Sequence, residues 1–128
     1  MESTTILIAD DDMNLLTTLR VRLQAEGFDV ITSQDVCQAL SIAQQDRPDL
    51  LLLDLNMSAG AGRSVKSHLA EIEELAGTPV IFTTAEPASH TPHDAADLGA
   101  CAVASKPVDT EALLGAIRGA LGLCMHNG

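Results

Sequence analysis

Short apolar runs alternate along this chain with longer segments in which apolar residues recur every three or four positions. The alternation is typical of βαβ crossovers, in which each strand is followed by a helix that packs back on a parallel sheet. Almost every position of the runs is apolar, as expected for strands covered by helices on both faces. The runs are residues 5–9, 28–32, 50–54, 80–83 and 101–104. We therefore predict an α/β fold with five strands, of which the second, the least apolar, lies nearest an edge.

Apolar stripes mark the helices that are expected to connect and follow these strands. The stripes are Leu16/Leu19/Leu23, Val36/Leu40/Ala43, Val65/Leu69/Ile72 and Leu113/Ile117/Leu121. A further helix is expected around residues 88–97, where Pro87 and Pro92 predict a late start or a loosely formed helix, because proline cannot donate a backbone hydrogen bond. Gly27 is expected to follow the first helix, and Asp109 to favour the start of the last.

Length and charge limit the domain organisation and the partners. The 128 residues, 46% of them hydrophobic, suit one domain with one core, so residues 1–128 are interpreted as a single domain. The 18 acidic and 7 basic residues give a net charge of −11, which predicts no direct binding to nucleic acid or to anionic membranes. No apolar run approaches the roughly 20 residues that span a bilayer, and a cytoplasmic location is expected.

Polar side chains follow four of the five expected strands. They are Asp10, Asp11 and Asp12 after the first, Asp54 at the end of the third, Thr83 and Thr84 at the end of the fourth, and Ser105 and Lys106 after the fifth. Ligands of open parallel sheets bind beyond the carboxyl ends of the strands, where the strand order reverses. These side chains are therefore expected to meet at one edge of the sheet.

Clustered carboxylates repel one another, so such a cluster either raises the pKa of a member or recruits a cation. Mg²⁺ prefers a few carboxylate or carbonyl oxygens and commonly shares its shell with a phosphoryl group. A lysine nearby adds a compact positive charge, and the whole set suits phosphoryl transfer to an aspartate nucleophile. Each residue also has a plainer interpretation: the three successive aspartates as a helix N-cap, Asp54 as a turn residue and Lys106 as a solvated charge. Their joint occurrence favours a site.

Four motifs together resemble the receiver domains of two-component response regulators, over about residues 5–122. They are ILIADDD at 6–12, PDLLLLDLNM at 48–57, PVIFTTAE at 79–86 and Lys106-Pro107. The resemblance implies a flavodoxin-like α/β fold with a five-stranded parallel sheet of order 2-1-3-4-5 and helices on both faces. It also implies a signalling switch, which catalyses only its own phosphorylation and slow dephosphorylation and is not otherwise an enzyme. A histidine kinase or a histidine phosphotransfer protein would supply the phosphoryl group, and an unknown downstream protein would receive the signal.

The resemblance assigns the phosphoryl group to Asp54, with Thr84 and Lys106 holding its oxygens. Mg²⁺ would be bound by the side chains of Asp11 and Asp54 and by the backbone carbonyl of Asn56. The same resemblance implies a cis peptide bond between Lys106 and Pro107.

A fourth metal ligand, Asp10, would act through water. A slip of one residue would make Asp11 and Asp12 the acidic pair, but Asp10 and Asp11 are favoured because they directly follow the apolar run.

Two positions depart from the family pattern. Ser58 stands where proline is usual, which predicts a more flexible loop after Asp54. Val103 stands where an aromatic residue or histidine is usual, so activation is expected to pass mainly through Thr84 and residues 85–92.

Two other functions fit parts of the pattern. A small Mg²⁺-dependent phosphatase with an aspartate nucleophile would need a second acid two residues after Asp54, where Asn56 stands. A degenerate interaction module is disfavoured by the intact acceptor and its neighbouring carboxylates.

Overall fold

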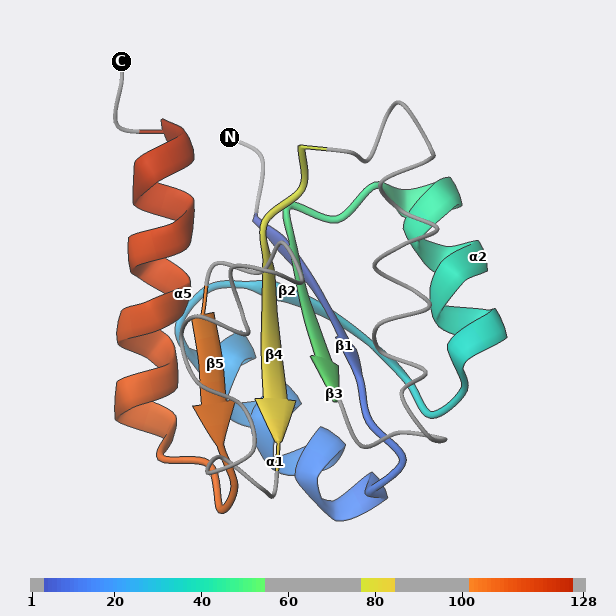
Figure 1. The fold of residues 1–128 in the computed structure, drawn as a ribbon, viewed down its shortest axis with the longest axis horizontal. Helices are drawn as coiled ribbons and strands as arrows, with labels where there is room; N and C mark the ends of the chain where they lie inside the picture. The colour runs from blue at the N-terminus through green and yellow to red at the C-terminus, as the bar shows by residue number, and fades with distance from the viewer. Residues whose placement is uncertain (1–3, 55–76, 85–101, 126–128) are drawn as a thin grey trace.

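The predicted alternation of strands and helices is realised around a five-stranded parallel sheet (Figure 1). The computed structural model describes residues 4–54, 77–84 and 102–125. The strands are β1 (Thr5–Ala9), β2 (Asp29–Ser33), β3 (Leu50–Asp54), β4 (Val80–Thr84) and β5 (Ala102–Ser105). Their order is β2-β1-β3-β4-β5, which confirms the expected order and places β2 at an edge. The helices expected around Val65/Leu69/Ile72 and residues 88–97 lie outside the described residues.

The register of the strands aligns their carboxyl ends. Ala9 pairs with Ser33 on one side and with Leu53 on the other, and Thr84 pairs with Ser105. The arrowheads of β3, β4 and β5 accordingly point to the same edge of the sheet (Figure 1). Residues that directly follow these strands are thereby brought close together in space.

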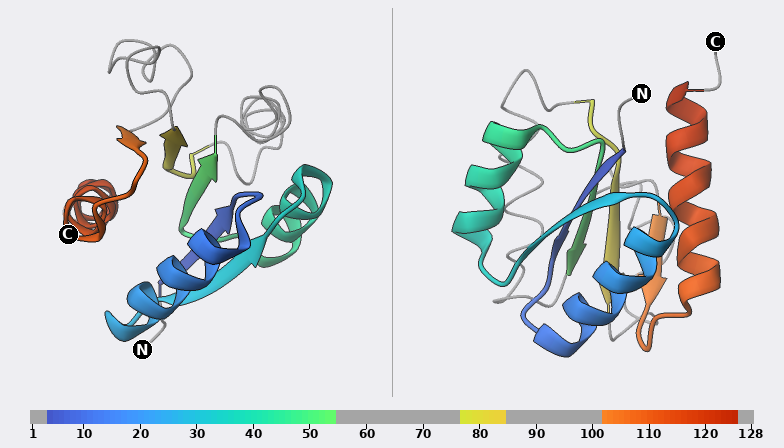
Figure 2. Two further views of the ribbon diagram at one scale, coloured as in Figure 1. Left: turned by 90° about the horizontal axis from the view of Figure 1, so that it is seen from below. Right: turned by 180° about the vertical axis from the view of Figure 1, so that it is seen from behind.

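Helices cover both faces of the sheet, as expected. The described helices are α1 (Met13–Ala25), α2 (Val36–Asp46) and α5 (Thr110–Met125). Figure 2 shows α1 and α5 on one face and α2 on the other. The main core lies under α1 and α5, where alternate strand residues meet the stripes predicted for these helices. This cluster includes Ile6, Ile8, Leu50, Leu52 and Ile81 from the strands, Leu16, Leu19 and Leu23 from α1, and Leu113, Leu114, Ile117 and Leu121 from α5.

Side chains and backbone groups fix the helix ends next to the sheet edge. Asp12 is the N-cap of α1, and its carboxylate accepts hydrogen bonds from the backbone N–H groups of Asn14 and Leu15. Asp109 accepts in the same way from the backbone at the start of α5. After α1 the chain turns at Gly27, whose φ of 96° suits glycine.

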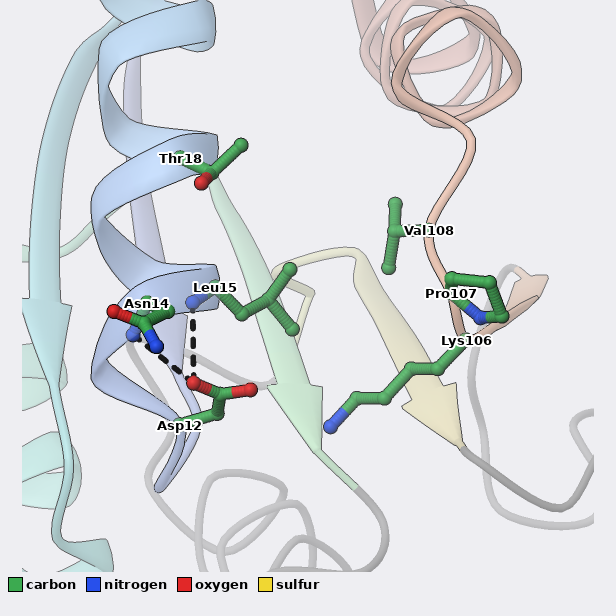
Figure 3. Close-up of a pocket in the computed structure, with 7 residues that line it drawn as sticks. All are labelled: Asp12, Asn14, Leu15, Thr18, Lys106, Pro107 and Val108. Carbon is green, nitrogen blue, oxygen red and sulfur yellow. Dashed lines mark hydrogen bonds between the residues drawn. The ribbon is translucent and has the colours of Figure 1, made fainter.

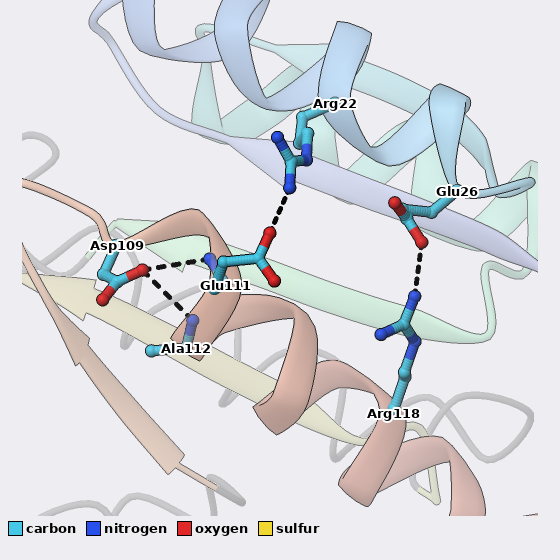
Figure 4. Close-up of polar contacts among 6 residues, drawn as sticks. All are labelled: Arg22, Glu26, Asp109, Glu111, Ala112 and Arg118. Atoms are coloured by element: carbon cyan, nitrogen blue, oxygen red, sulfur yellow. Dashed lines mark hydrogen bonds and ion pairs between the residues drawn. The ribbon is translucent and has the colours of Figure 1, made fainter.

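Two ion pairs join α1 and α5 on the surface (Figure 4). Arg22 of α1 pairs with Glu111 of α5, and Glu26, just after α1, pairs with Arg118 of α5. All four side chains are partly or largely exposed, and exposed pairs of this kind contribute little to stability. The apolar cluster beneath therefore holds the two helices together. Among the described residues, no helix is long and apolar enough to span a membrane.

Candidate functional site

Three carboxylates from two neighbouring strands meet at the carboxyl edge of the sheet. Asp10 and Asp11 follow β1, and Asp54 is the last residue of β3. Carboxylate oxygens of the three lie within 4.8 Å of one another. Asp10 and Asp54 are only 2% and 1% exposed, whereas Asp11 is exposed. Burial of two like charges is costly unless a cation accompanies them.

Lys106 supplies a positive charge to this cluster. Its Nζ lies 2.9 Å from Oδ2 of Asp10 and 3.3 Å from Oδ2 of Asp54, and its side chain is 20% exposed. Burial acts to lower the pKa of Lys106, but the hydrogen bond to Asp10 and the charges of Asp10 and Asp54 outweigh it, so that the pKa of Lys106 is raised. The lysine is therefore protonated throughout the neutral range.

The backbone aims Lys106 at the cluster. Its N–H donates to the carbonyl oxygen of Thr84 at 2.8 Å, which ties the residue after β5 to the end of β4. The Lys106–Pro107 peptide bond is cis, as the resemblance implied. Thr84 is fully buried next to this contact. The ends of β4 and β5 thus reach the same place as the acidic ends of β1 and β3.

The three successive aspartates have two different structural roles. Asp10 and Asp11 belong to the carboxylate cluster, whereas the carboxylate of Asp12 caps α1 (Figure 3). Oδ1 of Asp10 also accepts a hydrogen bond from the backbone N–H of Asp12 at 2.8 Å, so the start of α1 orients the buried carboxylate. This arrangement supports the pairing of Asp10 with Asp11 over the pairing of Asp11 with Asp12.

A groove of about 330 Å³ opens beside Lys106, between the first turns of α1 and the segment after β5 (Figure 3). Leu15 from α1 and Val108 from the segment after β5 come from its two sides. The groove has both polar and apolar walls, lined by Asp12, Asn14, Leu15, Thr18, Lys106, Pro107 and Val108.

The structure brings some of the predicted site residues together, and others lie outside the described residues. Asp10, Asp11, Asp54 and Lys106 are brought together, and Thr84 joins them through its backbone bond to Lys106. Asn56 and Ser58 lie outside the described residues. Val103 is within β5, and its side chain is not described.

One contact was missed by the reasoning from sequence. Nε2 of Gln34, which follows β2, donates to the carbonyl oxygen of Asp11 at 3.3 Å. Gln34 lies in a polar Ser-Gln-Asp stretch that is typical of an ordinary turn. The signal that could have found it is the strand order, because β2 lies beside β1 and both end at the same edge.

The donor set fits a hard divalent cation. Asp10, Asp11 and Asp54 offer only carboxylate oxygens, two of the side chains are buried, and one is open to solvent. Mg²⁺ takes oxygen ligands of this kind and keeps several waters, for which the exposed side of Asp11 leaves room.

Comparisons with known proteins point to one family. The family model described as the response regulator receiver domain matches residues 6–118. The transcriptional regulatory protein GlrR of Escherichia coli is 33% identical over 116 residues, which are 91% of this chain and 26% of that protein. The polar-differentiation response regulator DivK of Brucella anthropi is 28% identical over 122 residues, which are 95% of this chain and 98% of that protein.

A solved structure agrees with these matches. The chemotaxis protein CheY4 of Vibrio cholerae has a TM-score of 0.84 and 25% identity, and the alignment covers 93% of this chain and 99% of that chain. The chain thus spans nearly the full length of some relatives but only about a quarter of GlrR.

Proposed function

The chain belongs to the family of response regulator receiver domains of two-component signalling, and we propose that it accepts a phosphoryl group on Asp54. The observation that carries the proposal is the set of charged groups around Asp54. This carboxylate is buried at the end of β3, 3.3 Å from the Lys106 ammonium group, and shares a cluster with Asp10 and Asp11. A buried nucleophile beside a fixed cation and further carboxylates suits phosphoryl transfer, in which positioning and charge neutralisation supply most of the catalysis.

The proposed donor is a phosphohistidine of a histidine kinase or a histidine phosphotransfer protein. A carboxylate oxygen of Asp54 attacks phosphorus, a P–O bond forms, and the P–N bond to the donor imidazole breaks with its electron pair left on nitrogen. Asp54 then carries an acyl phosphate. A separate, slow step ends the phosphorylated state: water attacks phosphorus, the P–O bond to Asp54 breaks, inorganic phosphate leaves and the carboxylate is restored.

Lys106 and Thr84 are proposed to hold the phosphoryl oxygens. The pKa of Lys106 is raised by Asp10 and Asp54 despite burial, so its ammonium group is charged at neutral pH and can neutralise an oxygen without first gaining a proton. Thr84 is buried, and its carbonyl oxygen accepts the Lys106 N–H bond, which fixes the two residues relative to each other. The same interactions would make the phosphorylated form differ from the unmodified form in this part of the sheet edge.

Mg²⁺ is the proposed cofactor. Asp11 and Asp54 would bind it by their side chains, Asp10 through water and Asn56 by its backbone carbonyl. When bound, Mg²⁺ would neutralise part of the charge on the phosphoryl group. Lys106 faces two carboxylates with a single positive charge, so Mg²⁺ would help to balance the further negative charge that a phosphoryl group adds.

The output is proposed to be altered binding of a downstream protein. Residues 1–128 are proposed to act as one domain, which the match over residues 6–118 supports. GlrR is named as a transcriptional regulator, but this chain matches only 26% of it, and direct contact of this segment with DNA is not proposed because its net charge is −11. The phosphatase alternative is disfavoured because Asn56 replaces the acid that it needs.

Treatment with Mg²⁺ and a small phosphodonor such as phosphoramidate, followed by intact-mass spectrometry, tests the proposal. The unmodified sequence should gain one phosphoryl group, and Asp54→Asn should gain none. Asp46→Asn is the matched control, because Asp46 is exposed at the end of α2, away from the cluster. Equal labelling of Asp54→Asn and Asp46→Asn would refute the assignment.

A further inference from the structure

The three successive aspartates after β1, Asp10 to Asp12, are restrained by different hydrogen bonds. The buried carboxylate of Asp10 is held on both sides, by the backbone N–H of Asp12 at Oδ1 and by Lys106 at Oδ2. Asp12 is held by its own cap interactions with α1. The carboxylate of Asp11 is exposed and, among the described residues, makes no hydrogen bond or ion pair. Its position therefore depends on its backbone.

The backbone of Asp11 is restrained by Gln34. The ladder between β1 and β2 extends to the bond from the Asp10 N–H to the carbonyl oxygen of Ser33, at 3.0 Å. One residue further along each of the two segments that follow β1 and β2, Nε2 of Gln34 donates to the carbonyl oxygen of Asp11 at 3.3 Å. The glutamine side chain thus continues the connection between the two strand ends by one step beyond the backbone pairing.

Gln34 lies in a short segment whose two neighbouring residues are hydrogen-bonded. The hydroxyl of Ser33 is buried, accepts from the Asp35 N–H at 3.2 Å, and lies 2.8 Å from the Asp35 carbonyl oxygen. The carboxylate of Asp35 caps α2 by accepting from the Gln38 N–H at 3.0 Å. Both neighbours of Gln34 are therefore fixed, one to the strand and the other to the helix.

We infer that Gln34 is a positioning residue, which holds Asp11 ready to bind the divalent cation of the proposed function. The inference rests on that function and adds to it a contact from β2, a strand that carries none of the proposed ligands. An exposed ligand must lose conformational freedom when it binds a cation, and a fixed backbone reduces that loss. One hydrogen bond of ordinary net strength corresponds to a several-fold change in affinity.

The test measures Mg²⁺ affinity by isothermal titration calorimetry for the unmodified sequence, Gln34→Met and Gln45→Met. Methionine has about the length of glutamine but cannot donate a hydrogen bond. Gln45 is exposed near the end of α2 that is distant from the cluster, so it is a matched control. Gln34→Met should bind Mg²⁺ about 3–10-fold more weakly, which is the range for one hydrogen bond, and Gln45→Met should bind like the unmodified sequence.

Two further readouts separate a positioning role from a general loss of structure. Thermal unfolding in EDTA should stay cooperative in both methionine variants, with Gln34→Met losing at most the stability of one hydrogen bond. Amide exchange at Asp11 and Asp12 should be faster only in Gln34→Met. Affinity of Gln34→Met within twofold of the unmodified sequence would overturn the inference while leaving the proposed function intact. If the unmodified sequence itself bound no Mg²⁺, the metal part of the proposed function would fail, and the inference with it.

Discussion

The Nζ atom of Lys106 lies 3.3 Å from Oδ2 of Asp54, across the edge of the sheet at which β3 and β5 end. The two strands are not neighbours, because β4 lies between them. The contact therefore depends on the length of the lysine side chain and on the bond from its backbone N–H to Thr84 at the end of β4. A buried carboxylate acceptor with a fixed counter-ion is the feature on which the proposed chemistry depends.

The contribution of Lys106 to stability should disappear at high pH. Its pKa is raised above its ordinary value of 10.5 in the folded protein, so the folded state holds the proton more tightly than the unfolded state. The stabilisation is present in full below pH 10.5 and is lost as the pH rises through the folded-state pKa. The difference in unfolding free energy between the unmodified sequence and Lys106→Met, measured in urea, should be constant from pH 7 to 9 and shrink at higher pH.

Few other groups in this chain titrate at high pH and could obscure the comparison. The chain contains no tyrosine, and Lys66 is its only other lysine. Lys66 and the cysteines are present in both proteins, so their titration cancels in the difference. A difference that grew with rising pH would mean that the carboxylates do not hold the Lys106 proton.

Substitution of exposed glycines in α5 should stabilise the protein. Gly115 and Gly119 lie inside the helix, and a Cβ at either position would meet no atom within 4 Å. Alanine is preferred to glycine inside a helix by about 0.5–1 kcal/mol, chiefly because it has less freedom to lose. Gly115→Ala and Gly119→Ala should each raise the urea midpoint with an unchanged m-value.

Gly27→Ala is the opposite control. It also has open space, but its φ is 96°, where alanine is strained by about 1–2 kcal/mol. Stabilisation by all three substitutions would show that the backbone at Gly27 differs from the one described.

Strands β1, β3 and β4 were predictable from sequence because nearly all their positions are buried. The run of leucines from Leu50 to Leu53 can hardly be placed anywhere else, and β3 has the predicted bounds. The ends of β2, β4 and β5 differ from the prediction by one residue, and each of these strands ends in a polar residue: Ser33, Thr84 and Ser105. A polar residue at the end of a strand breaks the apolar pattern that was used to find the strand.

The candidate site was predictable to the extent that strand ends determine it. Asp10, Asp54 and Lys106 directly follow or end strands, so the parallel topology places them at the same edge of the sheet. The contact of Gln34 with Asp11 was predictable only in part: the strand order places the two residues side by side, but the hydrogen bond depends on the rotamer of one exposed side chain. The separate use of Asp12 as a helix cap is likewise a matter of local geometry, although aspartate at that place favours it.

Mg²⁺ should raise the stability of the folded protein. A ligand that binds only the folded state stabilises it by mass action, by about 2.7 kcal/mol at 100 times the dissociation constant. Thermal unfolding should therefore shift to higher temperature as Mg²⁺ is added, and Asp11→Ala should remove the shift. Asp11 is exposed, so its replacement should leave the protein folded. An equal shift in Asp11→Ala would place the cation elsewhere.

The central claim is that Asp54, and not another carboxylate of the cluster, accepts the phosphoryl group. It is tested most directly by treating the protein with Mg²⁺ and phosphoramidate, reducing the acyl phosphate with borohydride, and locating the modified residue by tandem mass spectrometry of peptides. Reduction converts a phosphorylated aspartate to homoserine, which marks the acceptor permanently. We predict homoserine at position 54 alone; homoserine at position 10, 11 or 12, or none at position 54 in a protein that has gained phosphate, would contradict the account.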